Sequence, residues 1–291
     1  MKTLIIGEVS NSTLSSGTLE ILGKAKELGT EFELITIGPD DAPSIGIDSI
    51  TQKYVKRNAE NLQFNNIATI ISEYIKDNEV KLVLSSSTYV CRDIISFISV
   101  DLLSSPVSNV IDFSISNGSV ETINSINGGE SIYKSKVNSE HALLLIRPKA
   151  FEPIEAEFND NYDTLEVEDS NIPIFDIFKE EKEGPQLEDS KIVISAGRGM
   201  VDKDNLNMIN ELANKLNAAV GGTRAIVDAG WMPYSQQVGQ TGKTVKPDIY
   251  IACGISRQRL AEFKTKKVLV VDENSFEEYE FSDVLPFNFE F

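Results

Sequence analysis

The stretch Lys191–Met200, KIVISAGRGM, predicts a short buried strand that runs directly into a glycine-containing turn. The apolar run Ile192–Ser195 has the length of a strand, and the two glycines of the turn permit close backbone approach after it. A helix is expected next, over Leu206–Leu216. Strand, turn and helix in this order form the repeating unit of a parallel α/β sheet.

The same alternation continues to the C-terminal side. Further strands are expected at Ala225–Val227, Ile249–Ala252 and Val268–Val271, with a helix over Ile255–Phe263. The last twenty residues are aromatic-rich, and we expect them to be irregular. The pattern predicts a doubly wound parallel sheet over residues 191–291.

The first half of the chain predicts a second α/β unit, with a Rossmann-like fold over residues 1–152. Strands are expected at Thr3–Val9, Phe32–Ile37 and Val80–Ser85, and helices at Thr18–Leu28, Asn65–Lys76 and Arg92–Leu103. From about Val107 to Arg147 the pattern changes to short strands, at Val120–Ile123, Ile132–Val137 and Ala142–Ile146. This change indicates an antiparallel edge or extension of the sheet.

Between the two units lies an acidic stretch. Residues 152–190 hold 14 acidic side chains and 2 lysines, a balance of −12 out of the formal −18 of the whole chain. Prolines and Gly184 interrupt it, so we expect residues 153–190 to form an inter-domain linker, or else a face for a basic partner. An apolar patch near residue 175 indicates that this linker is not fully disordered.

Composition excludes several classes of protein. The chain has one histidine, His141, which argues against a histidine-based triad or a multi-histidine metal site. Its two cysteines, Cys91 and Cys253, lack metal-type spacing and predict reduced thiols. The acidic balance argues against nucleic-acid binding. No apolar run reaches the roughly 20 residues of a membrane span, and no secretion signal is evident, so a cytoplasmic location is expected.

Four glycine-containing turns crowd the second unit. They are residues 196–199, 221–224, 238–243 and 254–256. Because ligands of open α/β sheets bind at the carboxyl ends of the strands, these turns indicate a site for an anionic cofactor, and a dinucleotide fits. Taken singly, each is also explained as an ordinary tight turn. Neither the G-x-G-x-x-G fingerprint nor the Walker A spacing is present, so a standard NAD site is not supported.

Longer motifs carry a resemblance to a known family. KIVISAGRGM and LNAAVGGTRAIVDAGWMPYSQQVGQTGKTVKPDIYIACGIS resemble the FAD-binding domain of electron transfer flavoprotein alpha subunits. In the first half, SSTYVCRDI and LIRPKAFEP resemble the same family, and the likeness fades after about residue 260. The resemblance implies an N-terminal α/β domain that packs with a beta subunit, and a C-terminal domain that holds FAD.

The resemblance also implies which residues hold the cofactor. Arg224 and Thr223 would lie near the isoalloxazine ring, and Arg198 would contact the cofactor from the first loop. Thr241 would hydrogen-bond near the flavin N5, with Val238, Gly239 and Gln240 in the same loop, and Ser256 would meet the pyrophosphate. A guanidinium near the flavin would stabilise negative charge on it. The alternative for Arg224 is a surface or inter-domain salt bridge.

The chain departs from the family pattern after Ser256. Residues 257–261 read Arg-Gln-Arg-Leu-Ala, two residues shorter than the usual run and without its histidine. Arg257 or Arg259, with Gln258 between them, could supply positive charge in place of the histidine or could bind phosphate. Alternatively, these arginines are simply solvated. At the next strand end Asp272 could accept hydrogen bonds from ribose hydroxyls, although an acid there repels phosphate.

We therefore expect a redox carrier rather than an enzyme with its own substrate. The resemblance implies that electrons pass from flavin dehydrogenases, such as the acyl-CoA dehydrogenases of fatty acid β-oxidation, to a quinone reductase or similar acceptor. Two alternatives stay open. One is a structural or binding subunit that has lost FAD, prompted by the altered 257–274 region. The other is a different nucleotide-dependent enzyme.

Overall fold

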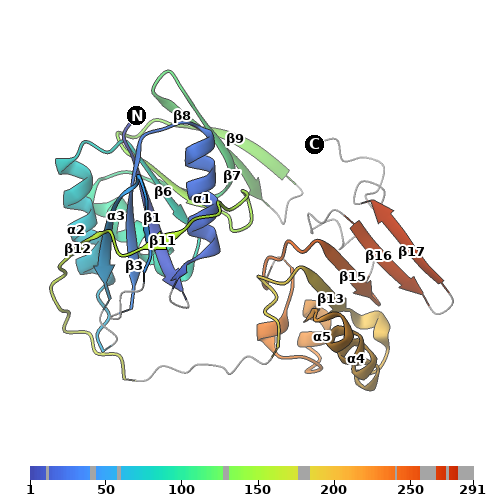
Figure 1. The fold of residues 1–291 in the computed structure, drawn as a ribbon. Helices are drawn as coiled ribbons and strands as arrows, with labels where there is room; N and C mark the ends of the chain where they lie inside the picture. The colour runs from blue at the N-terminus through green and yellow to red at the C-terminus, as the bar shows by residue number, and fades with distance from the viewer. Residues whose placement is uncertain are drawn as a thin grey trace. The chain divides into compact units, whose positions relative to one another are not determined.

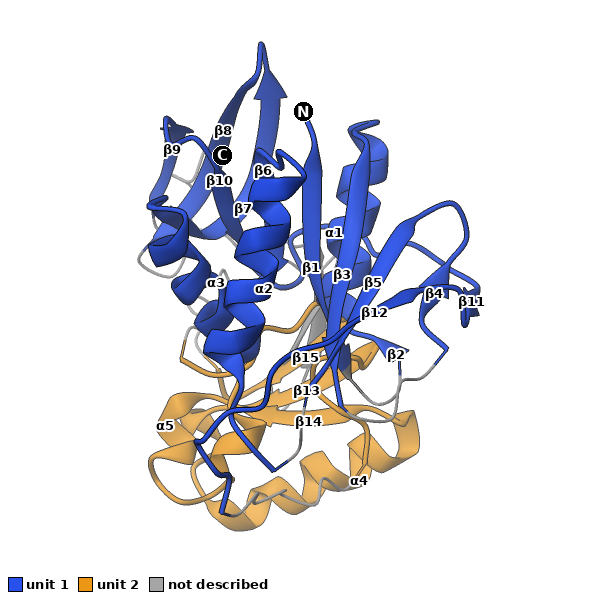
Figure 2. Ribbon diagram, turned by 90° about the vertical axis from the view of Figure 1, so that its left-hand side faces the viewer, with its two compact units in different colours: residues 1–178 blue, residues 179–291 orange. Residues whose placement is uncertain are grey.

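The computed structural model describes residues 1–10, 13–39, 44–57, 60–126, 131–175, 184–239, 241–255, 267–272 and 275–280, the last two ranges as backbone. The chain divides into two compact units, Met1–Phe178 and Lys179–Phe291 (Figure 2). Each unit has its own sheet and its own core, as the two-domain α/β prediction requires. No helix of the described residues is long and apolar enough to span a membrane.

Within the described part of unit 1, ten strands form one sheet (Figure 1). Seven of them run parallel in the order β12-β5-β3-β1-β6-β10-β7, and β8 and β9 continue from β7 as antiparallel strands. The tenth, β2, pairs antiparallel with β1. The strands are β1 (Thr3–Ser10), β2 (Thr13–Leu14), β3 (Phe32–Gly38), β5 (Thr51–Lys56), β6 (Leu82–Ser86), β7 (Pro106–Ser116), β8 (Ser119–Ile126), β9 (Ser131–Val137), β10 (Ala142–Ile146) and β12 (Asp163–Leu165).

Helices cover both faces of this sheet (Figure 1). They are α1 (Ser16–Glu27), α2 (Phe64–Asp77) and α3 (Tyr89–Asp101). Successive side chains of β1 point to opposite faces, so Ile5 packs in the cluster of α1 while Leu4 and Ile6 pack in the cluster of α2 and α3. On α2, apolar residues three to four apart bury one side, with Ile71 fully buried.

Some strands of unit 1 differ from the prediction. The strands β5 and β7 were not expected, whereas the antiparallel pairing of β8 and β9 is confirmed. The strand β10 was expected in the antiparallel extension, but it lies parallel between β6 and β7. Its sequence explains this placement, because all five residues of Ala142–Ile146 are apolar and buried, as is typical of an inner parallel strand.

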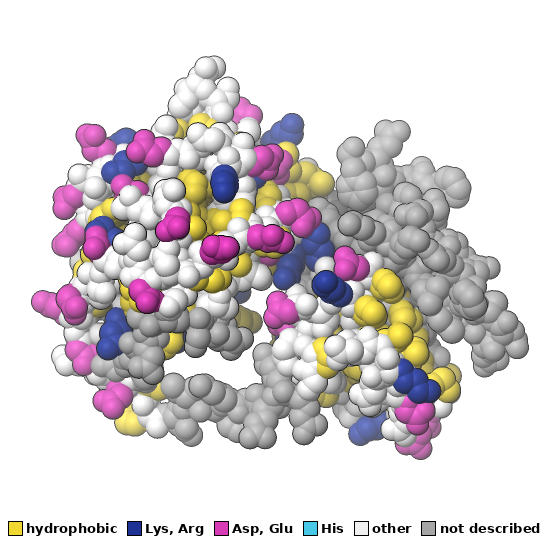
Figure 3. Space-filling view, viewed as in Figure 1, with side chains coloured by type: hydrophobic (Ala, Val, Ile, Leu, Met, Phe, Trp, Pro, Cys, Tyr) yellow, Lys and Arg dark blue, Asp and Glu magenta, His cyan; other side chains and the backbone are white. Residues whose placement is uncertain are grey.

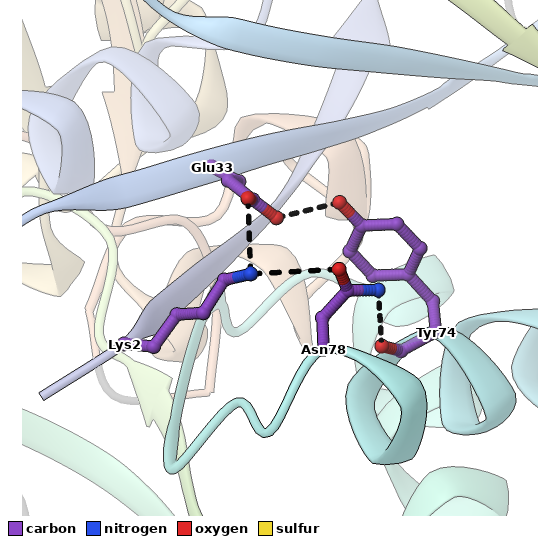
Figure 4. Close-up of polar contacts among 4 residues, drawn as sticks. All are labelled: Lys2, Glu33, Tyr74 and Asn78. Carbon is purple, nitrogen blue, oxygen red and sulfur yellow. Dashed lines mark hydrogen bonds and ion pairs between the residues drawn. The ribbon is translucent and has the colours of Figure 1, made fainter.

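A polar cluster fastens the C-terminal end of α2 to the starts of β1 and β3 (Figure 4). Lys2 Nζ lies 3.2 Å from Glu33 Oε1 and donates to Asn78 Oδ1 at 3.5 Å. The Tyr74 hydroxyl donates to Glu33 Oε2 at 2.5 Å. Burial first, and the adjacent Glu33 carboxylate second, raise the pKa of the Tyr74 phenol. Both charged side chains of the cluster, Lys2 and Glu33, thus have polar partners within it.

The first part of the predicted linker belongs to unit 1. The strand β11 (Phe158–Asn159) pairs antiparallel with β4 (Gly46–Ile47), and β12 pairs parallel with β5. Further along, Leu62 N donates to the carbonyl of Ile172 at 2.8 Å. Leu165 and Val167 pack against the cluster of α2 and α3, which explains why an acidic stretch is held on the sheet. The limits 1–152, 153–190 and 191–291 stay a prediction, and the compact division falls after Phe178.

In unit 2 the strand order is β14-β13-β15-β16-β17, with β17 antiparallel to the rest. The strands are β13 (Ile192–Ala196), β14 (Ala219–Gly222), β15 (Ile249–Cys253), β16 (Lys267–Asp272) and β17 (Ser275–Glu280). The helices in the described part of this unit are α4 (Leu206–Leu216) and α5 (Arg224–Val227), with 3-10 turns η2 (Arg198–Met200), η3 (Lys203–Asn205) and η4 (Tyr234–Gln236). Strands β13, β15 and β16 and helix α4 confirm the prediction.

Two expectations for unit 2 are wrong. Residues 225–227 were expected as a strand but form α5, because the strand ends earlier, at Gly222, and Thr223 begins the helix. The tail was expected to be irregular, but β17 pairs with β16 along its whole length. The predicted helix over Ile255–Phe263 falls almost entirely outside the described residues.

Candidate cofactor site

The carboxyl ends of β13, β14 and β15 lie at one edge of the unit 2 sheet, because the three strands are parallel (Figure 2). Backbone hydrogen bonds join the turns that follow them. Gly197 N donates to Cys253 O at 2.8 Å, and Gly199 N donates to Gly254 O at 2.9 Å. Thr223 N donates to Ala196 O at 2.9 Å. The structure therefore brings together three of the four predicted turns.

Glycine is required where the turns after β13 and β15 meet. Gly254 has a φ of +65°, a conformation that favours glycine. A Cβ on Gly199 would lie 2.9 Å from Gly254 Cα, and one on Gly197 would overlap the Gly254 carbonyl oxygen. The glycines of these two turns thus serve the close approach of one loop to the other.

The fourth turn, residues 238–243, joins the same edge beside β14. Val238 N donates to Gly222 O at 2.9 Å, and the Val238 side chain is buried. Gly239 has a φ of +122°, and its N–H donates to Lys243 O at 3.2 Å. The loop is therefore closed on itself and anchored to the end of β14.

Positively charged side chains surround this edge. The Arg198 guanidinium lies 5.0 Å from the centre of the Trp231 ring and is exposed. Arg224 Nε lies 3.2 Å from Asp228 Oδ2, and both side chains are more than half exposed, at 61% and 62%. Lys243 Nζ lies 2.9 Å from Glu188 Oε1. The described contact of Arg198 is thus an aromatic ring, whereas Arg224 and Lys243 each contact a carboxylate.

Two hydroxyl groups near the edge are buried without a hydrogen-bond partner among the described residues. They are Thr223 Oγ1, at the start of α5, and Ser195 Oγ, on β13. A buried polar group left unsatisfied costs about 1–3 kcal/mol, so such groups call for a ligand or a bound water. Together with Arg198 and Arg224, the Thr223 hydroxyl fits an anionic ligand that also accepts or donates hydrogen bonds.

The remaining predicted site residues fall into two groups. Thr241 is described and exposed, at the rim of the fourth turn. Gln240, Ser256, Arg257, Gln258 and Arg259 lie outside the described residues, and Asp272 is described as the backbone end of β16. The roles suggested for these six residues, like those of the other predicted site residues, stay predictions.

Sequence reasoning did not single out three residues of this edge. Trp231 packs against Arg198, while Tyr234 and Gln237 hold Thr241: the Tyr234 hydroxyl donates to Thr241 O at 2.8 Å, and Gln237 Nε2 donates to Thr241 Oγ1 at 2.9 Å. All three stand in the run GWMPYSQQ, directly before the 238–243 turn. That position, directly before the predicted turn, was the available signal.

Cys253 is half-buried and His141 is buried, so neither is a freely exposed reactive group. Burial raises the pKa of the Cys253 thiol, which disfavours the reactive thiolate. His141 is buried in unit 1, with Nδ1 2.8 Å from Val80 O. Within the described ranges no group of three or more His, Cys, Asp or Glu residues is placed to hold a metal ion. On the face of unit 1 drawn in Figure 3, Lys and Arg are interspersed with Asp and Glu rather than gathered into a basic stripe.

Fold and site together define a two-unit α/β protein whose second unit gathers its glycine-containing turns at the carboxyl edge of its sheet, where open α/β sheets bind nucleotide cofactors. Residues 3–170 match the family model of the electron transfer flavoprotein domain, and residues 186–259 match that of the electron transfer flavoprotein FAD-binding domain. The chain belongs to the electron transfer flavoprotein family.

Relatives are similar along nearly their whole length. The probable mitochondrial electron transfer flavoprotein subunit alpha of Caenorhabditis elegans is 31% identical over 92% of this chain and 83% of its own. The alpha subunit of Thermoanaerobacterium thermosaccharolyticum is 33% identical over 87% and 82%. That of Pseudomonas aeruginosa is 31% identical over 93% and 89%. The similarity therefore includes both units.

Proposed function

We propose that this chain is the FAD-binding alpha subunit of a heterodimeric electron carrier. The observation that supports this most is the convergence of the turns after β13, β14 and β15, which places Arg198, Thr223 and Arg224 at one sheet edge. The matches to both family models agree with it. FAD, when bound, supplies the redox chemistry by taking up and giving back electrons.

The chain's own residues bind and orient the cofactor. In the proposal, Arg198 and Arg224 supply positive charge, Thr223 Oγ1 gains the partner it lacks, and the 238–241 loop carries Thr241 to the ligand. A unit charge at about 4 Å is worth about 4 kcal/mol at an effective dielectric of about 20. Arg224 contributes less than this, because it is mostly exposed and Asp228 already offsets its charge.

The finer assignment names the partners. Unit 1 would pack with a beta subunit, flavin dehydrogenases such as the acyl-CoA dehydrogenases of fatty acid β-oxidation would donate electrons, and a quinone reductase or similar protein would accept them. The names of the relatives as alpha subunits support the heterodimer. No side chain of this chain is assigned a bond-making step, and a cytoplasmic location stays a prediction.

The test is an absorption spectrum of the chain purified with its beta partner, followed by anaerobic stepwise reduction. A flavin spectrum that bleaches and recovers reversibly supports the carrier. A colourless heterodimer after reconstitution with FAD would favour the FAD-free structural subunit. Turnover of NAD(H) by this chain alone would favour the other alternative, a nucleotide-dependent enzyme.

Arg224→Ala is the next variant to compare in this assay. We expect a lower reduction potential for the bound flavin, because the variant loses positive charge near it. Asp228→Asn is the matched control: it removes the negative partner of Arg224 and should shift the potential in the opposite direction. Equal potentials in all three proteins would remove Arg224 from the site.

A further inference from the structure

Gln237 is buried at the base of the 238–243 turn. Only 2% of its surface is exposed, although Thr241, four residues later in the turn, is exposed. Its carbonyl oxygen accepts a hydrogen bond from Lys243 N at 2.7 Å, and a Cβ on Gly242 would overlap that oxygen. The turn is therefore folded around the Gln237 backbone.

The side chain of Gln237 also reaches into the turn. Its amide Nε2 donates a hydrogen bond to Thr241 Oγ1 at 2.9 Å. An amide nitrogen of this kind can only donate, so the Thr241 hydroxyl oxygen is the acceptor. The hydroxyl hydrogen of Thr241 is left to point away from Gln237, and Thr241 itself is exposed.

A second contact fixes the backbone of Thr241. The Tyr234 hydroxyl donates to Thr241 O at 2.8 Å. The carbonyl oxygen and the hydroxyl oxygen of Thr241 thus each accept a hydrogen bond, and ordering of this kind lowers the entropic cost of binding a ligand. A buried amide that fixes an exposed hydroxyl is an arrangement that presents one hydrogen-bond donor in one direction.

We propose that Gln237 is a positioning residue that fixes the Thr241 hydroxyl as a hydrogen-bond donor toward the cofactor. The proposal rests on the proposed function, which places the 238–241 loop at FAD. Gln237 acts through Thr241, because its own side chain is buried beneath the turn. Its effect is on how tightly the flavin is held and on the potential at which it is reduced.

The test compares variants in the heterodimer, with the FAD dissociation constant and the flavin reduction potential as readouts. Gln237→Met keeps the length of the side chain and removes the donor. We expect about tenfold weaker FAD binding, close to the effect of Thr241→Val, which removes the hydroxyl itself. In the Thr241→Val background, Gln237→Met should have little further effect on either quantity.

Gln236→Met is the matched control, because Gln236 is the neighbouring glutamine and its side chain has no hydrogen bond within the described part of the chain. It should leave both readouts at their original values. Gln237→Glu adds a pH-dependent readout: the ionised carboxylate accepts rather than donates and turns the hydroxyl hydrogen inward, whereas the protonated acid still donates. FAD binding by this variant should weaken as pH rises, with no such trend in the original protein.

Three outcomes would overturn the proposal, and they are distinguishable. If Thr241→Val weakens FAD binding and Gln237→Met does not, Gln237 has no positioning role. If Gln237→Met weakens FAD binding equally with and without Thr241, it acts on the fold of the turn alone. If the original heterodimer binds no FAD, the proposed function itself fails, and the role of Gln237 fails with it.

Discussion

Gly254 holds a φ of +65° at the end of β15, and backbone atoms fill the place where a Cβ would lie. The nearest are Met200 N at 2.5 Å and Gly199 C at 2.6 Å. Gly230 has a similar φ of +71°, but nothing lies within 4 Å of its Cβ position. Comparing substitutions at the two glycines therefore separates the cost of backbone strain from the cost of steric overlap.

This pair gives a prediction for Gly254→Ala and Gly230→Ala. The second change should cost only the strain of a left-handed alanine, about 1–2 kcal/mol of unfolding free energy. Gly254→Ala should cost clearly more and should also weaken FAD binding, because the turns after β13 and β15 must move apart. Urea unfolding followed by Trp231 fluorescence measures the unfolding free energy of both variants. Equal losses of unfolding free energy would mean that the turns tolerate the overlap.

Cys91 gives a prediction on pH dependence. Burial first, and the nearby Glu8 carboxylate second, raise the pKa of its thiol from an ordinary 9.0 to about 11, while hydrogen bonds with Ser85 and Thr88 act in the opposite direction. The folded protein therefore keeps a proton that the unfolded chain loses. The stability that this provides is complete below pH 9 and is lost as pH rises to about 11.

The expected size is about 2–3 kcal/mol, since one pKa unit is worth about 1.36 kcal/mol. Cys91→Ala lacks the thiol, so its unfolding free energy should fall less steeply than that of the original protein between these pH values. Other titrating groups cancel in the comparison. Parallel pH profiles for the two proteins would contradict the raised pKa.

At the scale of single residues, sequence motifs indicated which residues lie at the sheet edge, and the roles of these residues at a cofactor stay predictions. Arg198, Thr223 and Arg224 were identified from glycine-rich turns and from resemblance, and the structure places them at one edge. Gln237 was not identified, because a glutamine before a turn has the same sequence appearance whether its side chain is exposed or buried. Arg224 forms an exposed ion pair with Asp228, four residues later, so the alternative of a surface salt bridge also has support.

Helix α1 shows how a local signal can fix one element. Ser15 directly precedes α1, and its Oγ accepts a hydrogen bond from Thr18 N at 3.3 Å and lies 2.8 Å from Thr18 Oγ1. Ser15→Ala should lower the unfolding free energy of unit 1 by about 1 kcal/mol. Thr69→Ala, at an exposed position of α2, is the control and should cost nothing, because alanine favours the helix interior. Chemical denaturation followed by circular dichroism measures both, and a Ser15→Ala loss no larger than that of the control would exclude the cap.

Elements without such signals were the ones the sequence missed. The strand β5 follows a turn rather than a helix, so strict alternation of strand and helix does not predict it. The order β3-β1-β6-β10-β7 also places β10 between strands that precede it in the chain. That insertion depends on long-range pairing, which the pattern of any one segment does not record.

For the whole molecule, the two units bury separate cores. Ile71 lies in a cluster of unit 1, whereas Trp231, the only tryptophan of the chain, packs against a cluster of unit 2. Tryptophan fluorescence therefore follows the unfolding of unit 2 alone, while circular dichroism follows both units. Separate cores predict separate thermal transitions.

FAD should consequently stabilise one unit and not the other. At a free concentration 100 times the dissociation constant, ligand binding adds about 2.7 kcal/mol to the stability of the unit that binds it. The fluorescence transition should move to higher temperature, while the remaining transition stays in place. Ile71→Ala is the reciprocal variant: a loss of about 2–5 kcal/mol should lower the unit 1 transition only. If FAD moved both transitions together, the two units would be energetically coupled, and the core of unit 1 would then contribute to cofactor binding.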